Sequence, residues 1–447
     1  MIQPKKILII SYYWPPAGGP GVQRWLKFVK YLPEFGWEPT VFIPENPSYP
    51  IVDETLQKEV PKNLKMIKTK IWEPYQLAEK FGKDNKKFKA GQFDVGNNQS
   101  WKSKLSIFIR GNFFIPDARI FWVKPSVEFL EKYLKTNHYD VLVTTGPPHS
   151  LHLIGLELKK KMPHLKWMAD FRDPWTEISY YKHLKLTNFA DKKHRKLEEQ
   201  VFQNADITLA TSYTDAENFR KKGANAFCVT NGFDEDVKEQ KSETAKLQNE
   251  SDIAISPLHD LTSKFTLSYI GVLEQLRNPE ILWQTLSELV EENEDFKKDF
   301  ELKFVGRLDD KILQTIENSS LKDNLQNLGY QTHDVALQHM QNSSVLLMTN
   351  FPQDSSKGII PGKIFEYLAT GKTILSFGPK EADVQKILEE TKAGKHFGYE
   401  EKESLKNFLL DAYQHWKSGT LNTRSENIEQ FSRKNLTKKL VDLLEYL

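Results

Sequence analysis

The stretch ILIISYYWPPAGGPGVQR, residues 7–24, decides the fold of this chain. It opens with an almost wholly apolar run of strand length, which is typical of a parallel strand buried on both faces. A loop rich in proline and glycine follows, and from Val22 onward the apolar residues recur at helical spacing. Gly36 is the expected stop signal of that helix, and residues 39–43 begin a second apolar strand. The stretch therefore predicts a βαβ unit with a glycine-rich first turn.

The same alternation of apolar strands and amphipathic helices continues along both halves of the chain. Between the halves, residues 236–264 are polar and charged and contain no aromatic residue, which indicates a linker or a surface insertion. We therefore predict an α/β protein with two Rossmann-like, doubly wound domains. The predicted parts are a first domain (residues 1–235), the linker (236–264), a second domain (265–425) and a terminal helix (426–447) that packs back on the first domain.

Composition and charge exclude several classes of protein. The 447 residues suffice for two or three domains. The 62 basic and 60 acidic residues give a net charge of +2, which argues against a nucleic-acid partner. The single cysteine, Cys228, excludes an internal disulfide framework and fits a reducing compartment. The apolar run at residues 7–10 is too short for a signal peptide, and no window approaches the roughly 20 apolar residues of a membrane span, so we expect a soluble, cytoplasmic protein.

The glycine-rich first turn raises the question of a dinucleotide cofactor. The dinucleotide fingerprint needs G-x-G-x-x-G, and the pattern that starts at Gly19 continues with Gly21 but reaches Arg24 where the third glycine should stand. The second strand also runs into Pro44 before Glu45, which is a poor position for an acid that binds ribose. The sequence therefore argues against a nicotinamide or flavin enzyme.

Polar residues follow two predicted strands of the first half. His149 comes just after the apolar strand at residues 139–145, and Asp173 follows a strand that begins near residue 165. Ligands bind at the carboxyl edge of an open parallel sheet, so both residues are candidates for catalytic roles, Asp173 through contact with an acceptor. Each also has a structural interpretation: His149 as an ordinary loop histidine, and Asp173 as an ion-pair partner of Arg172.

A second informative stretch is SSKGIIPGKIFEYLATGKTIL, residues 355–375. It predicts a glycine-containing loop, a short helix that begins near Lys363, a stop at Gly371 and a buried strand. The N-terminus of a helix attracts phosphate, and Lys363 and Glu366 lie in its first turn, where the glutamate suits ribose hydroxyls. Gly362, just before the helix, lets the backbone approach a ligand closely. A simpler interpretation is that Glu366 complements the helix dipole while Lys363 is solvated.

Residues 101–122 mix aromatic and apolar side chains with Lys102, Lys104, Arg110 and Arg119. A membrane interface attracts such a mixture, so a peripheral position on the inner face of a membrane is one interpretation. The other is an ordinary buried segment with solvated basic residues, and of the two we favour this one.

Six motifs lie on the expected strand ends in this order: YYWPPAGGPGVQR (12–24), GPPHS (146–150), DFRDPW (170–175), TNGFD (230–234), SYIGVL (268–273) and PGKIFEYLATGKTIL (361–375). Together they resemble the motifs of the GT-B glycosyltransferases, and in particular those of glycosyltransferase family 4, also called group 1. The resemblance covers nearly the whole chain. It implies transfer of a sugar from a nucleoside diphosphate sugar, usually with retention of anomeric configuration. It also implies a cleft between the two domains and no obligatory metal or other cofactor.

The resemblance implies roles for individual residues as well. Gly18 and Gly19 match a glycine loop near the diphosphate and the acceptor, and His149 matches a histidine near the donor sugar. Glu366 matches the second glutamate of the family's E-x7-E motif, which holds the ribose. Gly358 stands where the first glutamate would fall, which leaves open how the hydroxyls of the donor sugar are held.

Basic residues and further glycines complete the predicted donor site. Arg277 lies in the loop where the family places basic residues at the diphosphate, and Lys363 lies beside the glycine loop. Positioned cations stabilise the charge on a leaving diphosphate, which this chemistry needs more than it needs a nucleophile. The predicted donor-binding residues are Arg277, Lys363, Glu366, Gly271, Gly362 and Gly306.

These inferences predict an enzyme of the hexosyltransferase type that acts in cell-envelope polysaccharide synthesis. Its expected partners are a nucleotide sugar, a glycan or lipid-linked acceptor and, if residues 101–122 lie at an interface, a membrane surface. Two other functions use the same cleft: a nucleotide-sugar epimerase and a phosphorylase. A non-catalytic scaffold that has kept the fold is the remaining alternative, and Gly358 is compatible with it.

Overall fold

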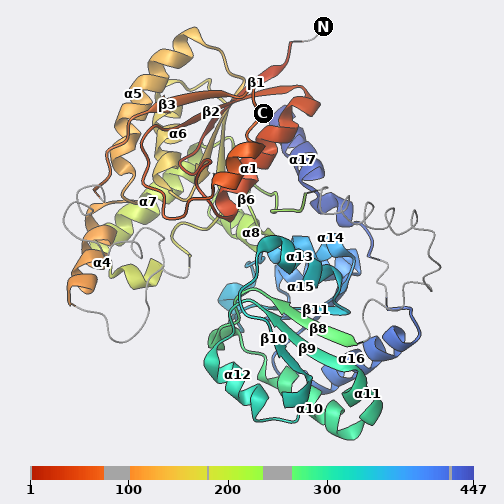
Figure 1. Cartoon of the computed structure of the whole chain (residues 1–447). Helices are drawn as coiled ribbons and strands as arrows, with labels where there is room; N and C mark the ends of the chain where they lie inside the picture. The colour runs from red at the N-terminus through yellow and green to blue at the C-terminus, as the bar shows by residue number, and fades with distance from the viewer. Residues whose placement is uncertain (1–2, 75–100, 179–180, 235–263, 422–424) are drawn as a thin grey trace. The chain divides into compact units, whose positions relative to one another are not determined.

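The computed structural model describes residues 3–74, 101–178, 181–234, 264–421 and 425–447 (Figure 1). The chain divides into two compact units. Unit 1 comprises Met1–Asn231 together with Arg433–Leu447, and unit 2 comprises Gly232–Ser432. Each unit contains one parallel β-sheet with helices on both faces, so the predicted fold class of two Rossmann-like α/β domains is confirmed.

The sheet of unit 1 has seven parallel strands in the order β3-β2-β1-β4-β5-β6-β7. The central strand β1 pairs on one side with β2, where Ile7 lies opposite Pro39, and on the other side with β4, where Ile7 lies opposite Val141. The strands are β1 (Lys5–Ile10), β2 (Trp37–Pro44), β3 (Lys65–Thr69), β4 (Val141–Gly146), β5 (Trp167–Phe171), β6 (Ile207–Ala210) and β7 (Ala226–Cys228).

Alternate residues of β1 face two different hydrophobic cores, as the period of two in a strand requires. Ile7 and Ile9 pack in the core formed by α1 (Pro20–Tyr31) and α17 (Arg433–Glu445). Leu8 and Ile10 pack in the core on the opposite face of the sheet. The helices of that face are α5 (Ile120–Thr136), α6 (Ser150–Lys161), α7 (Asn188–Asn204) and α8 (Tyr213–Lys221), while α4 (Trp101–Phe113) contacts α7.

The last helix of the chain, α17, belongs to unit 1 and packs on α1. Its residues Leu436, Leu440 and Leu444 are buried in the same core as Trp25 of α1. These positions are four residues apart, so they line one stripe of the helix. The terminal segment therefore completes the hydrophobic core of the unit in which the chain begins.

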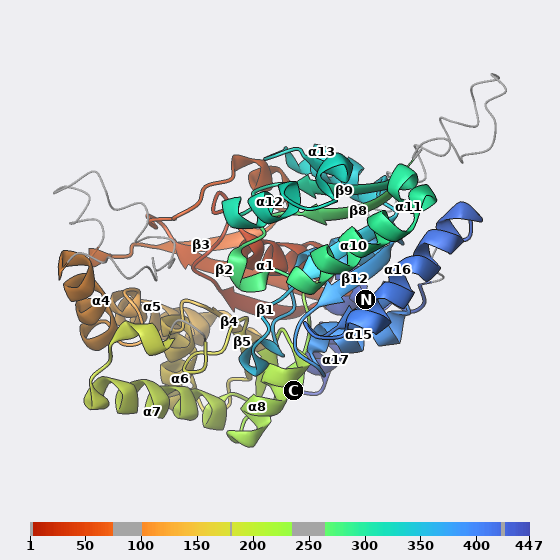
Figure 2. The ribbon, with the colours of Figure 1, turned by 90° about the horizontal axis from the view of Figure 1, so that it is seen from below.

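The sheet of unit 2 has six parallel strands in the order β10-β9-β8-β11-β12-β13. One face is covered by α10, α12 and α16, which lie in front of the sheet in Figure 2, and the other by α13, α14 and α15. The strands are β8 (Phe265–Ile270), β9 (Phe300–Val305), β10 (Leu325–Asn327), β11 (Val345–Thr349), β12 (Thr373–Phe377) and β13 (Gly394–Phe397). The helices are α10 (Glu280–Glu292), α11 (Glu294–Asp299), α12 (Asp310–Glu317), α13 (His333–Gln341), α14 (Lys363–Thr370), α15 (Asp383–Thr391) and α16 (Lys402–Lys417).

Both sheets reverse their strand order beside the first strand of the unit. In unit 1 this switch point lies between β1 and β4, and in unit 2 it lies between β8 and β11. The loops that follow these strands diverge to opposite faces of the sheet and leave a crevice at their carboxyl ends, which is where open α/β sheets bind ligands. The fold therefore predicts one candidate ligand-binding position in each unit.

Several elements differ from the sequence-based expectations. No strand was predicted between residues 46 and 100, but β3 (Lys65–Thr69) pairs with β2 at the edge of the sheet. Residues 101–122, whose position in the fold was open, supply α4 and the start of α5. The sequence between residues 81 and 100, rich in lysine, asparagine and glutamine, lies outside the described residues. Short 3₁₀ helices, which were not predicted, are η1 (Leu32–Phe35), η2 (Glu54–Glu59), η3 (Tyr181–Leu184), η4 (Gln275–Arg277), η5 (Lys322–Asn324), η6 (Asp354–Ser356) and η7 (Ile428–Phe431).

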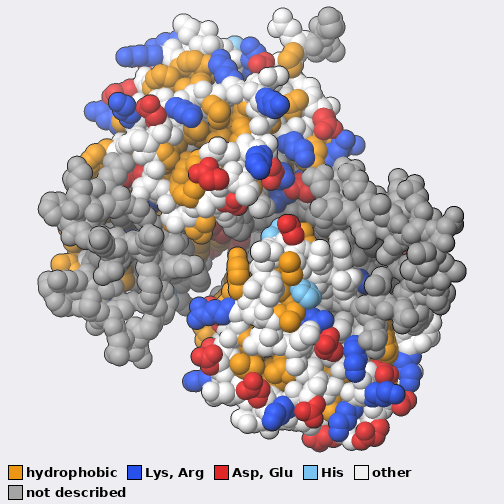
Figure 3. All heavy atoms as spheres, in the orientation of Figure 1, with side chains coloured by type: hydrophobic (Ala, Val, Ile, Leu, Met, Phe, Trp, Pro, Cys, Tyr) orange, Lys and Arg blue, Asp and Glu red, His pale blue; other side chains and the backbone are white. Residues whose placement is uncertain are grey.

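The surface carries both signs of charge. Lysine, arginine, aspartate and glutamate side chains are interspersed on the visible face of each unit (Figure 3), in keeping with the near balance of 62 basic and 60 acidic residues. Within the part of the chain that the structure describes, no helix is both long and apolar enough to cross a membrane.

The packing of α17 predicts the effect of a single substitution in unit 1. Leu440 is 0% exposed, so Leu440→Ala should lower the free energy of unfolding of unit 1 by about 2–5 kcal/mol. Leu276→Ala is the control, because Leu276 is 69% exposed and its truncation should change stability by less than about 0.5 kcal/mol. Urea unfolding followed by circular dichroism should show a shift of the unit 1 transition in Leu440→Ala alone. An unchanged transition would contradict the proposed contribution of α17.

Candidate functional site

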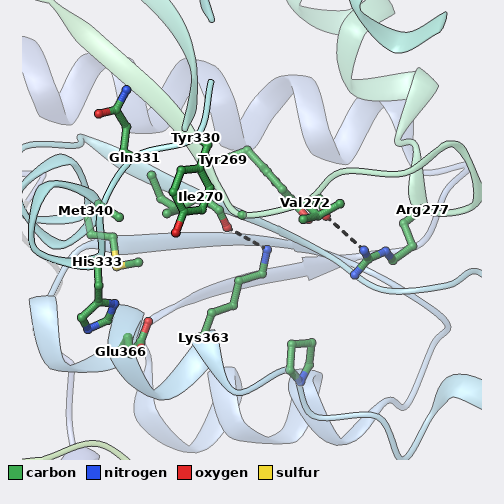
Figure 4. Close-up of a pocket in the computed structure, with 13 residues that line it drawn as sticks. Tyr269, Ile270, Val272, Arg277, Tyr330, Gln331, His333, Met340, Lys363 and Glu366 are labelled. Atoms are coloured by element: carbon green, nitrogen blue, oxygen red, sulfur yellow. Dashed lines mark hydrogen bonds between the residues drawn. The ribbon is translucent and has the colours of Figure 1, made fainter. Parts of the chain in front are cut away.

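A pocket of about 540 Å³ lies at the switch point of unit 2 (Figure 4). Its walls come from the end of β8, the 3₁₀ helix η4, the segment after β10, and the helices α13 and α14. The loops after β8 and β10 and the N-terminus of α14 therefore converge on one cavity. The lining residues are Tyr269, Ile270, Gly271, Val272, Arg277, Tyr330, Gln331, His333, Ala336, Met340, Pro361, Lys363 and Glu366.

Lys363 begins helix α14 and reaches toward the end of β8. Its ammonium nitrogen lies 3.3 Å from the carbonyl oxygen of Ile270 and 3.8 Å from the centre of the Tyr269 ring. Burial lowers the pKa of Lys363 from its usual value of 10.5, and the nearby Tyr269 opposes this shift. The charge of Lys363 is therefore poorly solvated, and an anion in the pocket would compensate for the lost solvation.

Arg277 lines the same pocket at the end away from Glu366 (Figure 4). Its Nη2 donates to the carbonyl oxygen of Val272 at 3.0 Å and lies 3.4 Å from the carboxylate of Glu274. The guanidinium also lies over the Phe351 ring, 5.4 Å from its centre. Its Nε is buried and has no hydrogen-bond partner among the described residues. The side chain is thus held in place while part of its donor capacity remains for a ligand.

Glu366 and His333 lie together at the end of the pocket away from Arg277 (Figure 4). One turn of α14 separates Glu366 from Lys363, so both side chains project toward the same cavity. The pocket therefore has two cations toward one end and a carboxylate at the other. This arrangement suits a ligand with an anionic group at one end and hydroxyl groups at the other.

The three glycines predicted for this site have different local environments. Gly271 and Gly306 have φ values of +117° and +125°, which side chains rarely adopt. A Cβ at Gly306 would lie 2.2 Å from the carbonyl oxygen of Gly271, so this glycine lets the ends of β8 and β9 approach each other. Gly362 has a helical φ of −55° and open space around it. Of the three, only Gly271 lines the pocket.

The predicted glycine loop lies at the switch point of unit 1, after β1. Gly19 is the N-cap of α1 with a φ of +102°, and a Cβ there would have no neighbour within 4 Å. Gly18 differs, since a Cβ would lie 2.9 Å from Ile51, and its N–H donates to the carbonyl oxygen of Ile51 at 3.0 Å. Gly18 therefore serves close packing of two chain segments, whereas Gly19 leaves open space at the start of α1.

His149 follows β4 at the same switch point and is the N-cap of α6. It is 6% exposed, and its ring stacks on Trp175 with a centroid distance of 5.2 Å and an interplanar angle of 4°. Neither ring nitrogen has a hydrogen-bond partner among the described residues. Burial, with a smaller effect from His152, lowers the pKa of His149 well below its usual value of 6.5. His149 is therefore a neutral imidazole at neutral pH, able to accept a hydrogen bond at one ring nitrogen and donate one at the other.

The DFRDPW motif divides between core and surface. Asp170 is fully buried and pairs with Arg24 at 2.9 Å, while the indole of Trp25 donates to the same carboxylate at 2.7 Å. Arg172 donates to the carbonyl oxygens of Gly146 and Pro147, so it links the ends of β4 and β5. Asp173 is exposed.

The structure brings together only part of the predicted set. Arg277, Lys363, Glu366 and Gly271 line one pocket of unit 2, while Gly306 lies behind Gly271 and Gly362 lies beside the pocket. Gly18, Gly19, His149 and Asp173 belong to unit 1. Five further residues that line the pocket lie outside the predicted set and outside the six motifs, although the Gly329–Tyr330 turn after a short strand was a usable signal. They are Tyr330, Gln331, His333, Ala336 and Met340.

Solved structures with this fold provide the comparison. No protein-family model matches the chain, and no curated protein matches it. Trehalose-6-phosphate synthase OtsA has a TM-score of 0.58 at 12% identity, over 99% of both chains. Sucrose-phosphate synthase of Thermosynechococcus elongatus has a TM-score of 0.57 at 14% identity, over 99% of this chain and 98% of that one. Anabaena HepE, solved with UDP and glucose, has a TM-score of 0.56 at 12% identity, over 99% and 100%.

These similarities establish the fold. The chain has the two-domain architecture of these proteins over almost its full length. With identities of 14% or less, the comparisons support no residue-by-residue transfer of function, so the chemistry of this chain has to be argued from its own side chains.

The buried histidines of unit 1 predict a pH dependence of stability. Burial lowers the pKa of His152 from 6.5 to about 3. Above pH 6.5 this histidine is neutral in both states, but below it the unfolded chain binds a proton that the folded chain does not. The free energy of unfolding should therefore fall by roughly 1.4 kcal/mol per pH unit from this group, between pH 6.5 and about 3. His149 acts in the same direction.

The test compares His152→Gln with the wild type in urea unfolding at several pH values. The difference in stability between the two should shrink as the pH falls below 6.5, because only the wild type loses the contribution of His152. His164→Gln, a change at an exposed histidine, should leave the pH profile of the wild type unaltered. Parallel profiles for His152→Gln and the wild type would contradict the assignment.

Proposed function

We propose that this chain is a glycosyltransferase that moves a sugar from a nucleoside diphosphate sugar to a glycan or lipid-linked acceptor. The observation that carries the proposal is the pocket in unit 2, where Lys363 and Arg277 face one cavity with Glu366 at its other end. The fold supports it, because OtsA, sucrose-phosphate synthase and HepE share the architecture, and HepE was solved with UDP and glucose.

The two cations suit the departure of a nucleoside diphosphate. When the bond between sugar and diphosphate breaks, negative charge grows on the leaving phosphate, and preorganised cations stabilise it. Lys363 and Arg277 are held by backbone carbonyls, so they need little rearrangement as this charge develops. Glu366 accepts hydrogen bonds from the ribose hydroxyls in this proposal. No group of three or more His, Cys, Asp or Glu side chains among the described residues is arranged to hold a metal ion.

The acceptor side of the proposal rests on unit 1. Gly19 leaves open space at the N-terminus of α1, and His149 is a neutral imidazole with unpaired ring nitrogens. We propose that His149 hydrogen-bonds the donor sugar as a neutral imidazole, and that the exposed Asp173 contacts the acceptor. On its motifs we propose membership of glycosyltransferase family 4, hexosyl transfer with retention of configuration, and a role in cell-envelope polysaccharide synthesis.

Activity assays separate this function from its alternatives. Thermal-shift screening against UDP-, GDP- and ADP-sugars would identify the donor, since a ligand that binds only the folded state raises its melting temperature. Product analysis then distinguishes the reactions. A transferase releases the nucleoside diphosphate only with an acceptor, an epimerase interconverts nucleotide sugars without one, and a phosphorylase releases a sugar phosphate. No shift with any nucleotide sugar would contradict the proposal.

The aromatic and basic segment supports a further part of the proposal, a peripheral contact with a membrane. Helix α4 packs on the rest of unit 1 through the buried Ile107 and through Gly111. A Cβ added at Gly111 would lie 2.7 Å from the side chain of Leu186. The apolar side chains of its other side are exposed at helical spacing, and residues 101–116 contain three basic residues and no acid. The exposed fractions are 47% for Leu105, 36% for Phe108, 38% for Ile109 and 71% for Phe113.

The lowered pKa of Lys363 predicts how nucleotide binding depends on pH. Only the protonated ammonium attracts phosphate, and burial lowers its pKa from 10.5, so the affinity for a nucleoside diphosphate should fall as the pH rises through this lowered value. Lys363→Met should weaken binding about 10- to 100-fold at neutral pH and abolish the alkaline fall. Isothermal titration calorimetry with UDP, GDP and ADP from pH 6 to pH 10 measures both effects.

Lys380→Met provides the control for loss of a lysine from unit 2. The Lys380 side chain is 80% exposed, and it does not line the pocket, so this variant should bind like the wild type. If Lys363→Met and the wild type bound the nucleoside diphosphates with equal affinity, Lys363 would not be part of the binding site.

Liposome flotation tests the membrane contact of α4. The wild type should float with vesicles containing anionic lipid at low salt, and Phe108→Ser with Phe113→Ser should weaken binding about tenfold or more, because two apolar side chains no longer enter the interface. Tyr446→Ser is the control, since Tyr446 is 75% exposed and lies beyond the end of α17. Absence of wild-type flotation at low salt would contradict this part of the proposal.

A further inference from the structure

One buried asparagine makes several hydrogen bonds to the segment that leads into the pocket. Residues 351–362, which we call the donor loop, connect β11 to α14 and end immediately before Lys363. Residues 352–355 of this loop are exposed, and the burial of apolar side chains contributes little to its shape. Hydrogen bonds must therefore hold the donor loop in place.

Asn350 supplies these hydrogen bonds from the end of β11. Its side chain is buried, with a residue exposure of 4%. The Nδ2 group donates to the carbonyl oxygen of Ile359 at 2.9 Å and to that of Ser356 at 3.3 Å. The Oδ1 atom accepts from the N–H of Phe351 at 2.9 Å. One amide side chain thus ties together the beginning, the middle and the end of the donor loop.

The backbone of Asn350 is fixed as firmly as its side chain. Its N–H donates to the carbonyl oxygen of Phe377 at 2.8 Å, which continues the pairing of β11 with β12. Its carbonyl oxygen accepts a hydrogen bond from the hydroxyl of Tyr399, and this hydroxyl also lies 3.5 Å from the carbonyl oxygen of Arg277. Asn350 is therefore rigidly attached to the sheet, and its partner Tyr399 also reaches the segment that bears Arg277.

Both cations of the pocket depend on this arrangement. Phe351, whose N–H binds Asn350, places its ring 5.4 Å from the guanidinium of Arg277. Ile359, whose carbonyl oxygen accepts from Asn350, lies four residues before Lys363. A change in the conformation of the donor loop would consequently move the surface beneath Arg277 and the start of α14 together.

We propose that Asn350 is a positioning residue for the phosphate-binding end of the pocket, acting through the donor loop on Lys363 and Arg277. This inference rests on the proposed binding of a nucleoside diphosphate. The position requires a side chain with both N–H donors and an acceptor, which aspartate lacks because a carboxylate only accepts. In Asn350→Asp, a carboxylate oxygen would face the carbonyl oxygens of Ser356 and Ile359, and the loop would lose both hydrogen bonds that Asn350 donates.

Asn324 offers a closely matched control within the same unit. It is 9% exposed, and its Nδ2 also donates to two backbone carbonyl oxygens, those of Lys297 and Phe300, each at 2.8 Å. It does not line the pocket. Asn324→Asp therefore makes the same chemical change in a comparable environment, so a general loss of stability in unit 2 should appear in both variants.

The experiment measures the affinities of UDP, GDP and ADP and of the nucleosides uridine, guanosine and adenosine by isothermal titration calorimetry. Asn350→Asp should weaken binding of the diphosphate about tenfold or more and leave the nucleoside within about twofold, because the misplaced groups face the phosphates. Asn324→Asp should preserve the ratio of diphosphate to nucleoside affinity. Tyr399→Phe, which removes a single hydroxyl, should change this ratio in the same direction by a smaller factor.

Amide hydrogen exchange tests the positioning role without any ligand. Exchange in residues 351–362 should accelerate about tenfold or more in Asn350→Asp relative to both the wild type and Asn324→Asp. Unchanged exchange, or an unchanged ratio of diphosphate to nucleoside affinity, would overturn the role of Asn350. A different result is that the wild type binds none of the three nucleoside diphosphates while exchange is still accelerated in Asn350→Asp. That result would overturn the proposed function but would confirm that Asn350 stabilises the donor loop.

Discussion

The burial of parallel strands on both faces constrains everything else in this chain. All six residues of β8 are buried, as are the last four of β1, so these strands have no solvent-facing side on which polar side chains can stand. Functional groups are therefore confined to strand ends and to the loops that follow them. Because both sheets reverse order beside their first strand, the loops diverge there, and the carboxyl ends of β8 and β11 become the place where a pocket can form.

The same constraint explains which elements the sequence predicts. Residues 7–10 of β1 and 373–377 of β12 are buried, so their apolar runs stand out. The glycine at 371 marks the end of α14 with its left-handed φ of +66°. The edge strand β3 was missed because its sequence, KMIKT, carries two lysines and lies partly exposed. The helix α16 was also missed, because its stripe of buried residues alternates with many charged ones.

The candidate site was predictable where a residue type itself indicates the chemistry. Lys363 and Glu366 were chosen as charged residues in the first turn of a helix, and Arg277 because its loop resembles one in which the family places basic residues. The structure gathers all three in one pocket. Asn350 could not be found this way, since its importance lies in hydrogen bonds to carbonyl oxygens up to nine residues away, which depend on loop conformation. The roles of the glycines could not be predicted for a related reason. Gly18 packs closely against Ile51, which is distant in the sequence, and no local sequence pattern shows this contact.

Buried polar groups in both units differ in whether the described residues satisfy their hydrogen bonds. Asp170 is fully buried, and Arg24, Trp25 and Thr145 all donate to its carboxylate, so it is complete without any ligand. The ring nitrogens of His149 and the Nε of Arg277 are buried without such partners among the described residues. Each unsatisfied group costs about 1–3 kcal/mol of stability. Both groups lie at a switch point, where a ligand that supplies the missing partners would recover that free energy on binding.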